Sequence, residues 1–258
     1  MTSFVHVDYP QQHPGVARAE AVMQAAGRLR QGFDGTRGIA ALLLAGIDEP
    51  TRTPPPRRQC ASDLREGAAF VTGNPLLRAI AMTAIFFNVG FFLIQAVYVP
   101  YASRQLGLSP IEVGATLAAY GAGMIVGALV APHVMARFRL GQVIIVGPLC
   151  GLAASLTLCL TLLAPSPWLA AASYFQLGFG PILWVISSTT LRQAVTPESM
   201  LGRVSALIST ATYGARPIGT LIGAVLGGTA GAQPCLVVAV LAFAIQACVI
   251  VRSPAARL

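Results

Sequence analysis

The sequence predicts an all-α membrane protein whose six transmembrane helices form two three-helix repeats. The first observation is composition: of 258 residues, 55% are hydrophobic and only 10% are charged, and the mean hydropathy is +0.70. Soluble domains carry about a quarter charged residues, and disordered chains combine low hydrophobicity with high net charge. The other two observations are the long apolar stretches after residue 77 and the distribution of Arg between them. Together they exclude an ordinary cytosolic enzyme.

Residues 1–58 are expected to form a polar N-terminal segment and linker. Within it, the apolar run 39–47 is too short to cross about 30 Å of hydrocarbon, and no signal-peptide core precedes it. Residues 59–76 are expected to form an interfacial helix, with Asp63 as its N-cap and Glu66 three residues later. A solvated connector helix is the alternative interpretation.

Residues 77–258 form the predicted six-helix transmembrane domain. Each apolar stretch has about twenty residues or more, which is enough to cross the bilayer at about 1.5 Å per residue. The loops on one side carry Arg in every case, whereas the opposite loops carry Arg104 alone, so both termini are expected in the cytoplasm of a multi-pass inner or plasma membrane protein. The expected spans are 78–100, 111–135, 141–163, 167–190, 204–228 and 233–252.

The charge balance indicates the partner of this domain. All 17 basic residues are Arg, and residues 67–258 hold nine of them but only two acids, Glu112 and Glu198. This positive charge would face anionic lipid headgroups. No basic stripe with interleaved aromatic residues is present, so the predicted partner is the lipid bilayer and not nucleic acid.

Glycines in the second and fifth spans predict close helix packing. Gly219, Gly223 and Gly227 recur every fourth residue, as do Gly123 and Gly127, and such stripes let two helix backbones approach each other. Tyr-Gly-Ala occurs once in the middle span of each triplet, 120–122 and 213–215, which suits an inverted three-plus-three repeat. Chance is the other explanation of this tripeptide.

Four polar residues inside the spans are candidates for a substrate path. Asn88 and Gln95 share a face of the first span, Gln176 lies in the fourth, and Arg216 lies near the middle of the fifth. A charge at that depth is expensive, so Arg216 faces a cavity or an anionic substrate group, or is a structural Arg held by backbone carbonyls near Pro217. Interhelical hydrogen bonding is the alternative for the three amides.

The loop before the fifth span carries a helix-start signal. Thr196 is expected as N-cap, Pro197 at the first helical position and Glu198 in the first turn of a short interfacial helix. Gly202 and Arg203 would then lead into the span. This loop motif is either a functional cytoplasmic element or a loop anchor only.

Several absences argue against catalysis. Without Lys no phosphate loop of the Walker A type can form, and the sequence has neither a metalloprotease HExxH nor a GxSxG elbow. The five cysteines show no CxxC spacing. The sequence therefore predicts no enzyme, no metal site and no cofactor.

With these residues placed, the sequence resembles the C-terminal half of a major facilitator superfamily transporter, in the bacterial branch of drug and siderophore exporters. The resemblance covers about residues 60–258. It implies twelve spans in two six-helix halves, a central cavity lined by the first and fourth helices of each half, and the linker 51–58 as the loop between halves. It rests on Asn74-Pro-Leu-Leu-Arg78, Pro197-Glu-Ser-Met-Leu-Gly-Arg-Val-Ser205, Gly214-Ala-Arg-Pro-Ile-Gly219 and Arg252-Ser-Pro254.

The function that the resemblance implies is small-molecule efflux by alternating access, with an unknown substrate. The family's first half is missing here apart from 39–47, and the stretch 127–141 lacks the Asp of the family's loop motif. Two hypotheses stay open. The chain is half of a transporter, completed by a missing N-terminal half or a second copy that docks where Arg216 faces, or it is a non-transporting gene remnant or membrane interaction subunit.

Overall fold

The structure, a computed structural model, describes residues 59–257, and the expectations for residues 1–58 lie outside this part of the chain. The described part is helical, without strands. A short helix, α3 (Gln59–Gly73), precedes six long ones, and a single 3₁₀ turn (Pro254–Arg257) follows them. The long helices are α4 (Pro75–Arg104), α5 (Pro110–Arg137), α6 (Leu140–Leu160), α7 (Pro167–Val195), α8 (Glu198–Ala230) and α9 (Ala232–Arg252).

Local capping determines where several of these helices begin. Asn74 caps α4, since its side-chain oxygen accepts from the amides of Leu76 and Leu77. Ser109 and Glu112 form a reciprocal capping box at the start of α5, with the Ser109 amide 2.8 Å from the Glu112 carboxylate. Gly231 separates α8 from α9 at φ +85°, a left-handed conformation that residues with a Cβ rarely adopt.

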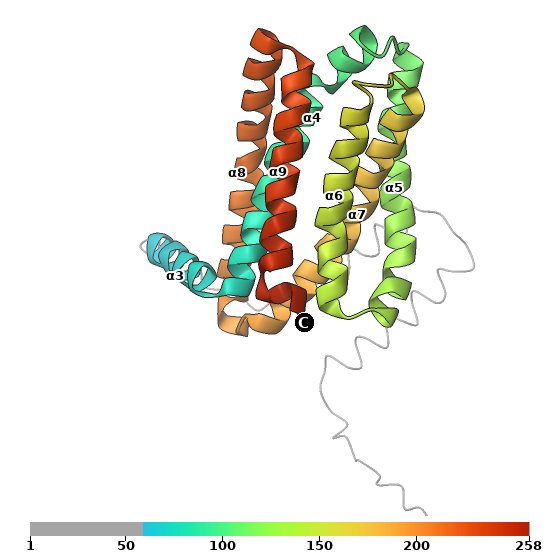
Figure 1. Ribbon diagram of the computed structural model, residues 1–258. Coiled ribbons are helices and arrows are strands. Elements are labelled where there is room, and N and C mark those ends of the chain that lie inside the picture. Colours follow the sequence, from blue (N-terminus) through green and yellow to red (C-terminus); the bar gives the residue numbers. More distant parts are fainter. Residues whose placement is uncertain (1–58, 258) are drawn as a thin grey trace, which may run out of the picture. The chain divides into compact units, whose positions relative to one another are not determined.

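The six long helices pack as two triplets that Figure 1 shows side by side, α4, α8 and α9 in one and α5, α6 and α7 in the other. Within the triplets, α4 packs against both α8 and α9, and α7 packs against both α5 and α6. Contact between α6 and α9 joins them. The largest buried cluster lies between the triplets and includes Leu93, Tyr98, Leu158, Tyr174 and Phe243.

Two helix pairs approach each other through glycine. A Cβ on Gly219 of α8 would collide with the carbonyl oxygen of Val89 in α4, and a Cβ on Gly223 would lie 2.8 Å from that of Leu93. The same arrangement joins α5 to α7, where Gly123 faces the carbonyl of Phe175 and Gly127 that of Phe179, the latter at 2.8 Å from an added Cβ. Gly227 lies one turn further along α8, against the side chain of Val97. The glycine stripes therefore lie at the α4–α8 and α5–α7 contacts.

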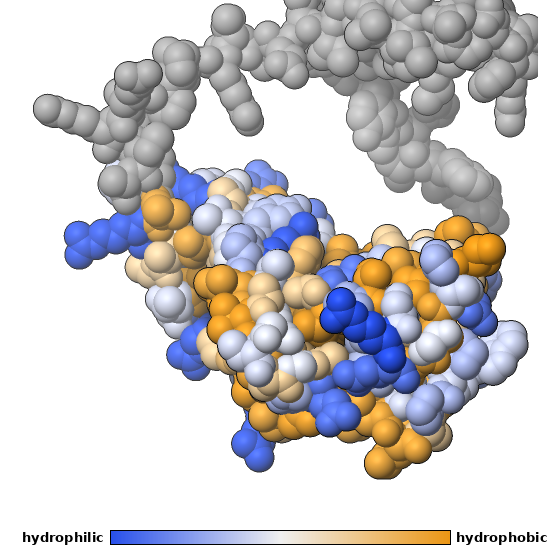
Figure 2. Space-filling model, turned by 90° about the horizontal axis from the view of Figure 1, so that it is seen from above, coloured by the Kyte–Doolittle hydropathy of each residue, from blue (hydrophilic) through white to orange (hydrophobic). Residues whose placement is uncertain are grey.

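Hydrophobic side chains reach much of the outer edge of the described unit (Figure 2). They include Ile125 and Leu129 of α5 and Leu221 and Val225 of α8, all more than half exposed. By length and composition, five helices are apolar enough to cross a membrane: α4, α5, α6, α7 and α9. The sixth long helix, α8, has 33 residues but falls short of that apolarity, and it contains Glu198, Arg203 and Arg216.

Two helix starts differ from those expected. Helix α3 begins at Gln59, so Asp63 lies inside it and is not its N-cap. Thr196 is the C-cap of α7 and Pro197 the N-cap of α8, because proline favours an extended residue before it and Thr196 has ψ 125°. Gly202 and Arg203 lie inside the continuous helix α8, and no separate interfacial helix precedes it. The N-cap predicted for the helix before the fifth span was therefore wrong by one residue. The prediction of a separate short interfacial helix there was also wrong.

Helix α3 contacts the beginning of α8. Figure 1 shows it running across the direction of the long helices, at the end of the bundle where α8 begins. Arg203 donates to the Glu66 carboxylate at 2.7 Å, and Gly67 lies close to the Arg203 backbone. The loop-motif residue Arg203 thus ties α3 to the six-helix unit.

Candidate functional site

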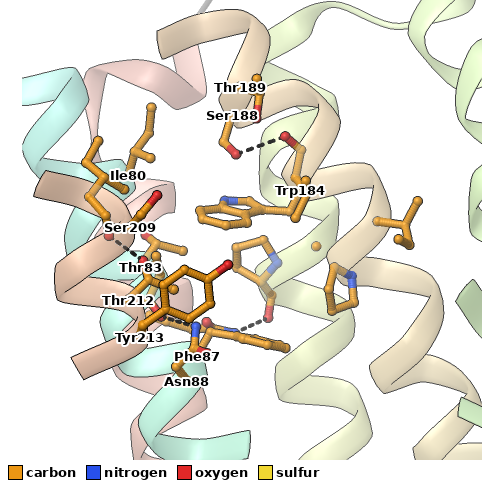
Figure 3. Close-up of a pocket in the computed structure, with 18 of the residues that line it drawn as sticks. Ile80, Thr83, Phe87, Asn88, Trp184, Ser188, Thr189, Ser209, Thr212 and Tyr213 are labelled. Carbon is orange, nitrogen blue, oxygen red and sulfur yellow. Dashed lines mark hydrogen bonds between the residues drawn. The ribbon is translucent and has the colours of Figure 1, made fainter. Parts of the chain in front are cut away.

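A cavity of about 380 Å³ lies between the two triplets and is lined by residues of all six long helices. Figure 3 shows the Trp184 ring in the middle of it, with Ser188 and Thr189 on one side and the α8 residues Ser209, Thr212 and Tyr213 across from them. Aromatic rings and small polar groups share the lining. A pocket of this size with an apolar body and a few polar groups is typical of small-molecule binding sites.

Arg216 of α8 supplies positive charge to this cavity. Its Nε donates to Oδ1 of Asn88 on α4 at 3.1 Å. Its guanidinium also lies over two rings, 4.3 Å from the centroid of Tyr213 and 5.1 Å from that of Phe92. Cation–π contacts of this kind partly replace the solvation that a charge loses away from water. Within residues 59–257, no carboxylate pairs with this arginine.

Asn88 is held so that its oxygen faces Arg216. Its Nδ2 donates to the Ala84 carbonyl one turn back at 2.9 Å, and the residue is buried. An amide that donates on one side presents its acceptor on the other. The predicted residues Asn88 and Arg216 therefore meet in the cavity, joined by a hydrogen bond between α4 and α8.

The other two predicted path residues lie elsewhere. Gln95 is exposed, and its Oε1 accepts from the hydroxyl of Tyr174 at 2.8 Å, a bond between α4 and α7. Gln176 does not line the cavity, and its Oε1 is buried without a partner. Gln95 lies seven positions beyond Asn88 along α4, and Gln176 lies two positions before Gly178, which does line the cavity.

Most of the lining was missed by sequence reasoning. Phe87, Tyr120 and Trp184 lie within apolar runs, where an aromatic residue looks like any core residue. Arg192 is not among the predicted path residues, although it lies in the last turn of α7 and lines the cavity. One signal was available: Ser209, Thr212 and Arg216 recur at helical spacing along one face of α8.

The polar groups that line the cavity are hydrogen-bonding and charged groups suited to binding a molecule. Among the described residues, no three His, Cys, Asp or Glu side chains lie close enough together to hold a metal ion. The polar lining consists of hydroxyls, amides, an indole and two guanidinium groups, and it contains no carboxylate. Such groups can form hydrogen bonds to a ligand, and the two guanidinium groups can balance a negative charge on it.

Comparison with known proteins gives a family and a set of relatives. A family model described as Major Facilitator Superfamily matches residues 38–220 and 80–257. The multidrug efflux pump Tap of Mycobacterium tuberculosis (strain ATCC 25618 / H37Rv) is 26% identical over 226 residues, covering 85% of this chain and 51% of that protein. Tap of Mycolicibacterium fortuitum is 26% identical over 196 residues, covering 75% and 46%. The chain thus spans about half the length of the curated relatives it matches.

Proposed function

Because this chain belongs to the major facilitator superfamily, we propose that it forms one six-helix half of a multi-pass membrane transporter that exports small molecules by alternating access. The observation that carries the proposal is the match to proteins named multidrug efflux pumps over 85% of the chain. The cavity supplies the binding place, and Asn88 and Arg216 are proposed as part of the substrate path.

An inverted repeat of two three-helix units is supported by the helix contacts. Exchanging α4, α5 and α6 for α7, α8 and α9 turns the α4–α8 contact into α7–α5 and the α4–α9 contact into α7–α6. The glycine contacts follow the same exchange: Gly219 against Val89 corresponds to Gly123 against Phe175, and Gly223 against Leu93 corresponds to Gly127 against Phe179. Such repeats are the rule in this kind of transporter.

We further propose that α8 is the sixth crossing and that both termini lie in the cytoplasm of the cell membrane. Helix α8 packs along α4, which is apolar enough to span, and its 33 residues exceed the length that a crossing needs. Its Arg216 is shielded by Asn88 and two rings. At the bundle end where α4 and α8 begin lie Arg137 at the end of α5, Arg139 before α6, Arg192 in the last turn of α7 and Arg252 at the end of α9 (Figure 1).

A second six-helix unit, from an N-terminal half or another copy, is the proposed partner. Few residues of α5 and α8 are buried, and both helices expose large apolar side chains, such as Ile125 and Leu129 of α5 and Leu221 and Val225 of α8. The half-length match to the relatives points to the same partner. A non-transporting remnant or interaction subunit is the competing proposal.

Reconstitution in liposomes tests the proposal. Residues 67–258 hold two acids, Glu112 and Glu198, both in the first turn of a helix, so this part of the chain offers no titratable carboxylate at the middle of the membrane. We expect no pH-gradient-driven efflux by the chain alone, and efflux after co-reconstitution with the first six helices of Tap. Robust efflux by the chain alone contradicts the need for an N-terminal half and leaves a second copy as the partner. Association with the Tap helices without efflux favours the interaction subunit.

A further inference from the structure

Four buried polar atoms around the cavity lack a hydrogen-bond partner in the described part of the chain: Thr83 Oγ1, Trp184 Nε1, Arg192 Nε and Gln246 Oε1. Two of these side chains are almost completely enclosed, since Thr83 is 1% exposed and Gln246 is 0% exposed. Native structures leave few buried polar groups unpaired, so a cluster in one cavity indicates a place for a polar ligand group. In Figure 3, Thr83 and Trp184 both border the same space.

The unpaired groups favour a ligand that accepts hydrogen bonds. The indole N–H of Trp184 and the Nε–H of Arg192 can only donate, and the Thr83 hydroxyl can donate as well. Gln246 already donates to the Pro148 carbonyl at 3.4 Å, so its free oxygen is the one group that only accepts. Donors therefore outnumber acceptors among the unpaired atoms.

The charge of the lining favours a negative ligand. Arg192 and Arg216 both line the cavity, and no Asp or Glu does. Neither arginine forms an ion pair with a residue in the range 59–257. In surroundings poorer in water than bulk solvent, two uncompensated positive charges attract an anion and repel a cation strongly.

The rest of the lining favours an apolar or aromatic body. The rings of Phe87, Tyr120, Trp184 and Tyr213 border the cavity together with aliphatic side chains. Aromatic faces of this kind stack on flat ligands. The volume of about 380 Å³ accommodates a molecule larger than a single substituted ring.

We propose that this cavity binds amphiphilic anions, in which an aromatic or apolar body carries a carboxylate or sulfonate, in preference to cations of the same size. The inference rests on the proposed function for the statement that these anions are cargo. The anion binds with its oxygens toward Arg192, Trp184 and Thr83 and its body among the rings.

Tryptophan fluorescence of the full chain gives a local readout. The chain has two tryptophans, and Trp168 is 82% exposed, so Trp168→Phe leaves Trp184 in the cavity as the only emitter. This protein, in phosphatidylcholine nanodiscs, is titrated with three quenchers that share one ring: 4-nitrobenzoate, 4-nitrobenzyl alcohol and 4-nitrobenzylammonium. We expect the anion to quench with a dissociation constant about tenfold or more below that of the cation, the alcohol lying between.

Variants assign the preference to the cavity arginines. Arg192→Gln and Arg216→Gln should each weaken binding of the anion severalfold and leave the alcohol unchanged, whereas Arg192→Lys, which keeps the charge, should retain the preference. Arg137→Gln removes an exposed arginine at the end of α5 and is the matched control. A preference for the cation, equal binding of all three probes, or an equal loss in the Arg137→Gln protein overturns the proposal; thermal unfolding confirms that each variant is folded.

Two further experiments distinguish a lipid headgroup from a free solute as the source of the anion, and the proposed transport function from the proposed anion preference. Nanodiscs with anionic phosphatidylglycerol compete with 4-nitrobenzoate if the cavity takes a lipid headgroup, and do not compete if it takes a free solute; both results keep an anion in the cavity. Anion binding without efflux in the co-reconstituted liposomes contradicts the transport function alone. Efflux without anion preference contradicts this inference alone.

Discussion

At the scale of single residues, the contact between Arg216 and Asn88 is the most informative. It links α4 to α8 inside the cavity, and within residues 59–257 it is the one hydrogen bond that the guanidinium makes to another side chain. A hydrogen bond to a charged group contributes about 1.5–3 kcal/mol, and leaving a charged donor unpaired costs at least as much. Each of the two side chains therefore contributes more to the stability of the fold when the other is present.

A double-mutant cycle tests this coupling. We expect Asn88→Leu to lower the free energy of unfolding by about 1–3 kcal/mol in the natural chain and by less in an Arg216→Met background, because there no charge is stranded. The measurement is unfolding in mixed detergent micelles followed by circular dichroism. Additive losses in the double variant would show that the two side chains do not interact.

A polar residue in an apolar stretch is a candidate for the substrate path, but its polarity alone does not show that it lines the cavity. Asn88, Gln95, Gln176 and Arg216 all stand out as polar residues in spans, and only Asn88 and Arg216 line the cavity. Periodicity assigns residues to a common face but does not say which face meets the cavity, since that depends on the rotation of each helix in the bundle. Trp184 and Tyr120 were missed because rings are equally expected in lipid, core and cavity.

At the scale of helices, the glycine contacts explain which pairs stay together. The backbone of α8 lies on that of α4 at Gly219, and the backbone of α5 lies on that of α7 at Gly123. Small residues permit such approaches, which provide van der Waals contact where acyl chains offer no hydrophobic driving force. A single methyl group at either position has to push two helices apart.

Alanine substitutions in matched pairs test this. Gly219→Ala and Gly123→Ala should each destabilise the chain by about 1–3 kcal/mol, as overpacking does. Gly214→Ala in α8 and Gly121→Ala in α5 are the controls, because nothing lies within 4 Å of an added Cβ there, and both should be neutral or slightly stabilising. The measurement is thermal unfolding in detergent; equal effects at all four sites would contradict the contact geometry.

The helices themselves were largely predictable. The long apolar runs predicted all six long helices to within a few residues at most ends. The reason is that a segment in lipid must satisfy its backbone hydrogen bonds internally, so a long apolar run is expected to be a helix. Ends set by local competition were not predictable: Thr196 carries an N-cap signal, yet the following proline holds it extended as the C-cap of α7. The apolarity of α8 also falls short of a span, because the helix contains Arg203, Arg216 and many Gly, Ser and Thr residues.

At the scale of the whole molecule, the proposed topology makes the two ends of the bundle chemically distinct. The loops between α4 and α5, α6 and α7, and α8 and α9 lie at one end, where Arg104 is the one arginine among residues 59–257, while Arg137, Arg139, Arg192 and Arg252 lie at the other end (Figure 1). Ser166, just before α7, belongs to the first set, and Phe138, just after α5, to the second.

Cysteine labelling distinguishes these two ends. In a cysteine-free background, Ser166→Cys should react with a membrane-impermeant maleimide only from outside the cell, and Phe138→Cys only in inside-out vesicles. The positive-inside rule is the physical reason, since arginine-rich loops are retained in the cytoplasm. Labelling of Ser166→Cys from the cytoplasmic side would invert the topology, and labelling of both positions from one side would contradict the single crossing between them, that of α6.

The close backbone contacts of α4 with α8 and of α5 with α7 also determine how the bundle responds to temperature. In water, the burial of apolar surface becomes a weaker driving force as temperature falls. Inside a bilayer, the two glycine-mediated pairs are held by dispersion, whose contribution is an enthalpy and does not fade on cooling. Cold therefore leaves these pairs closed, and warming is the change that separates them.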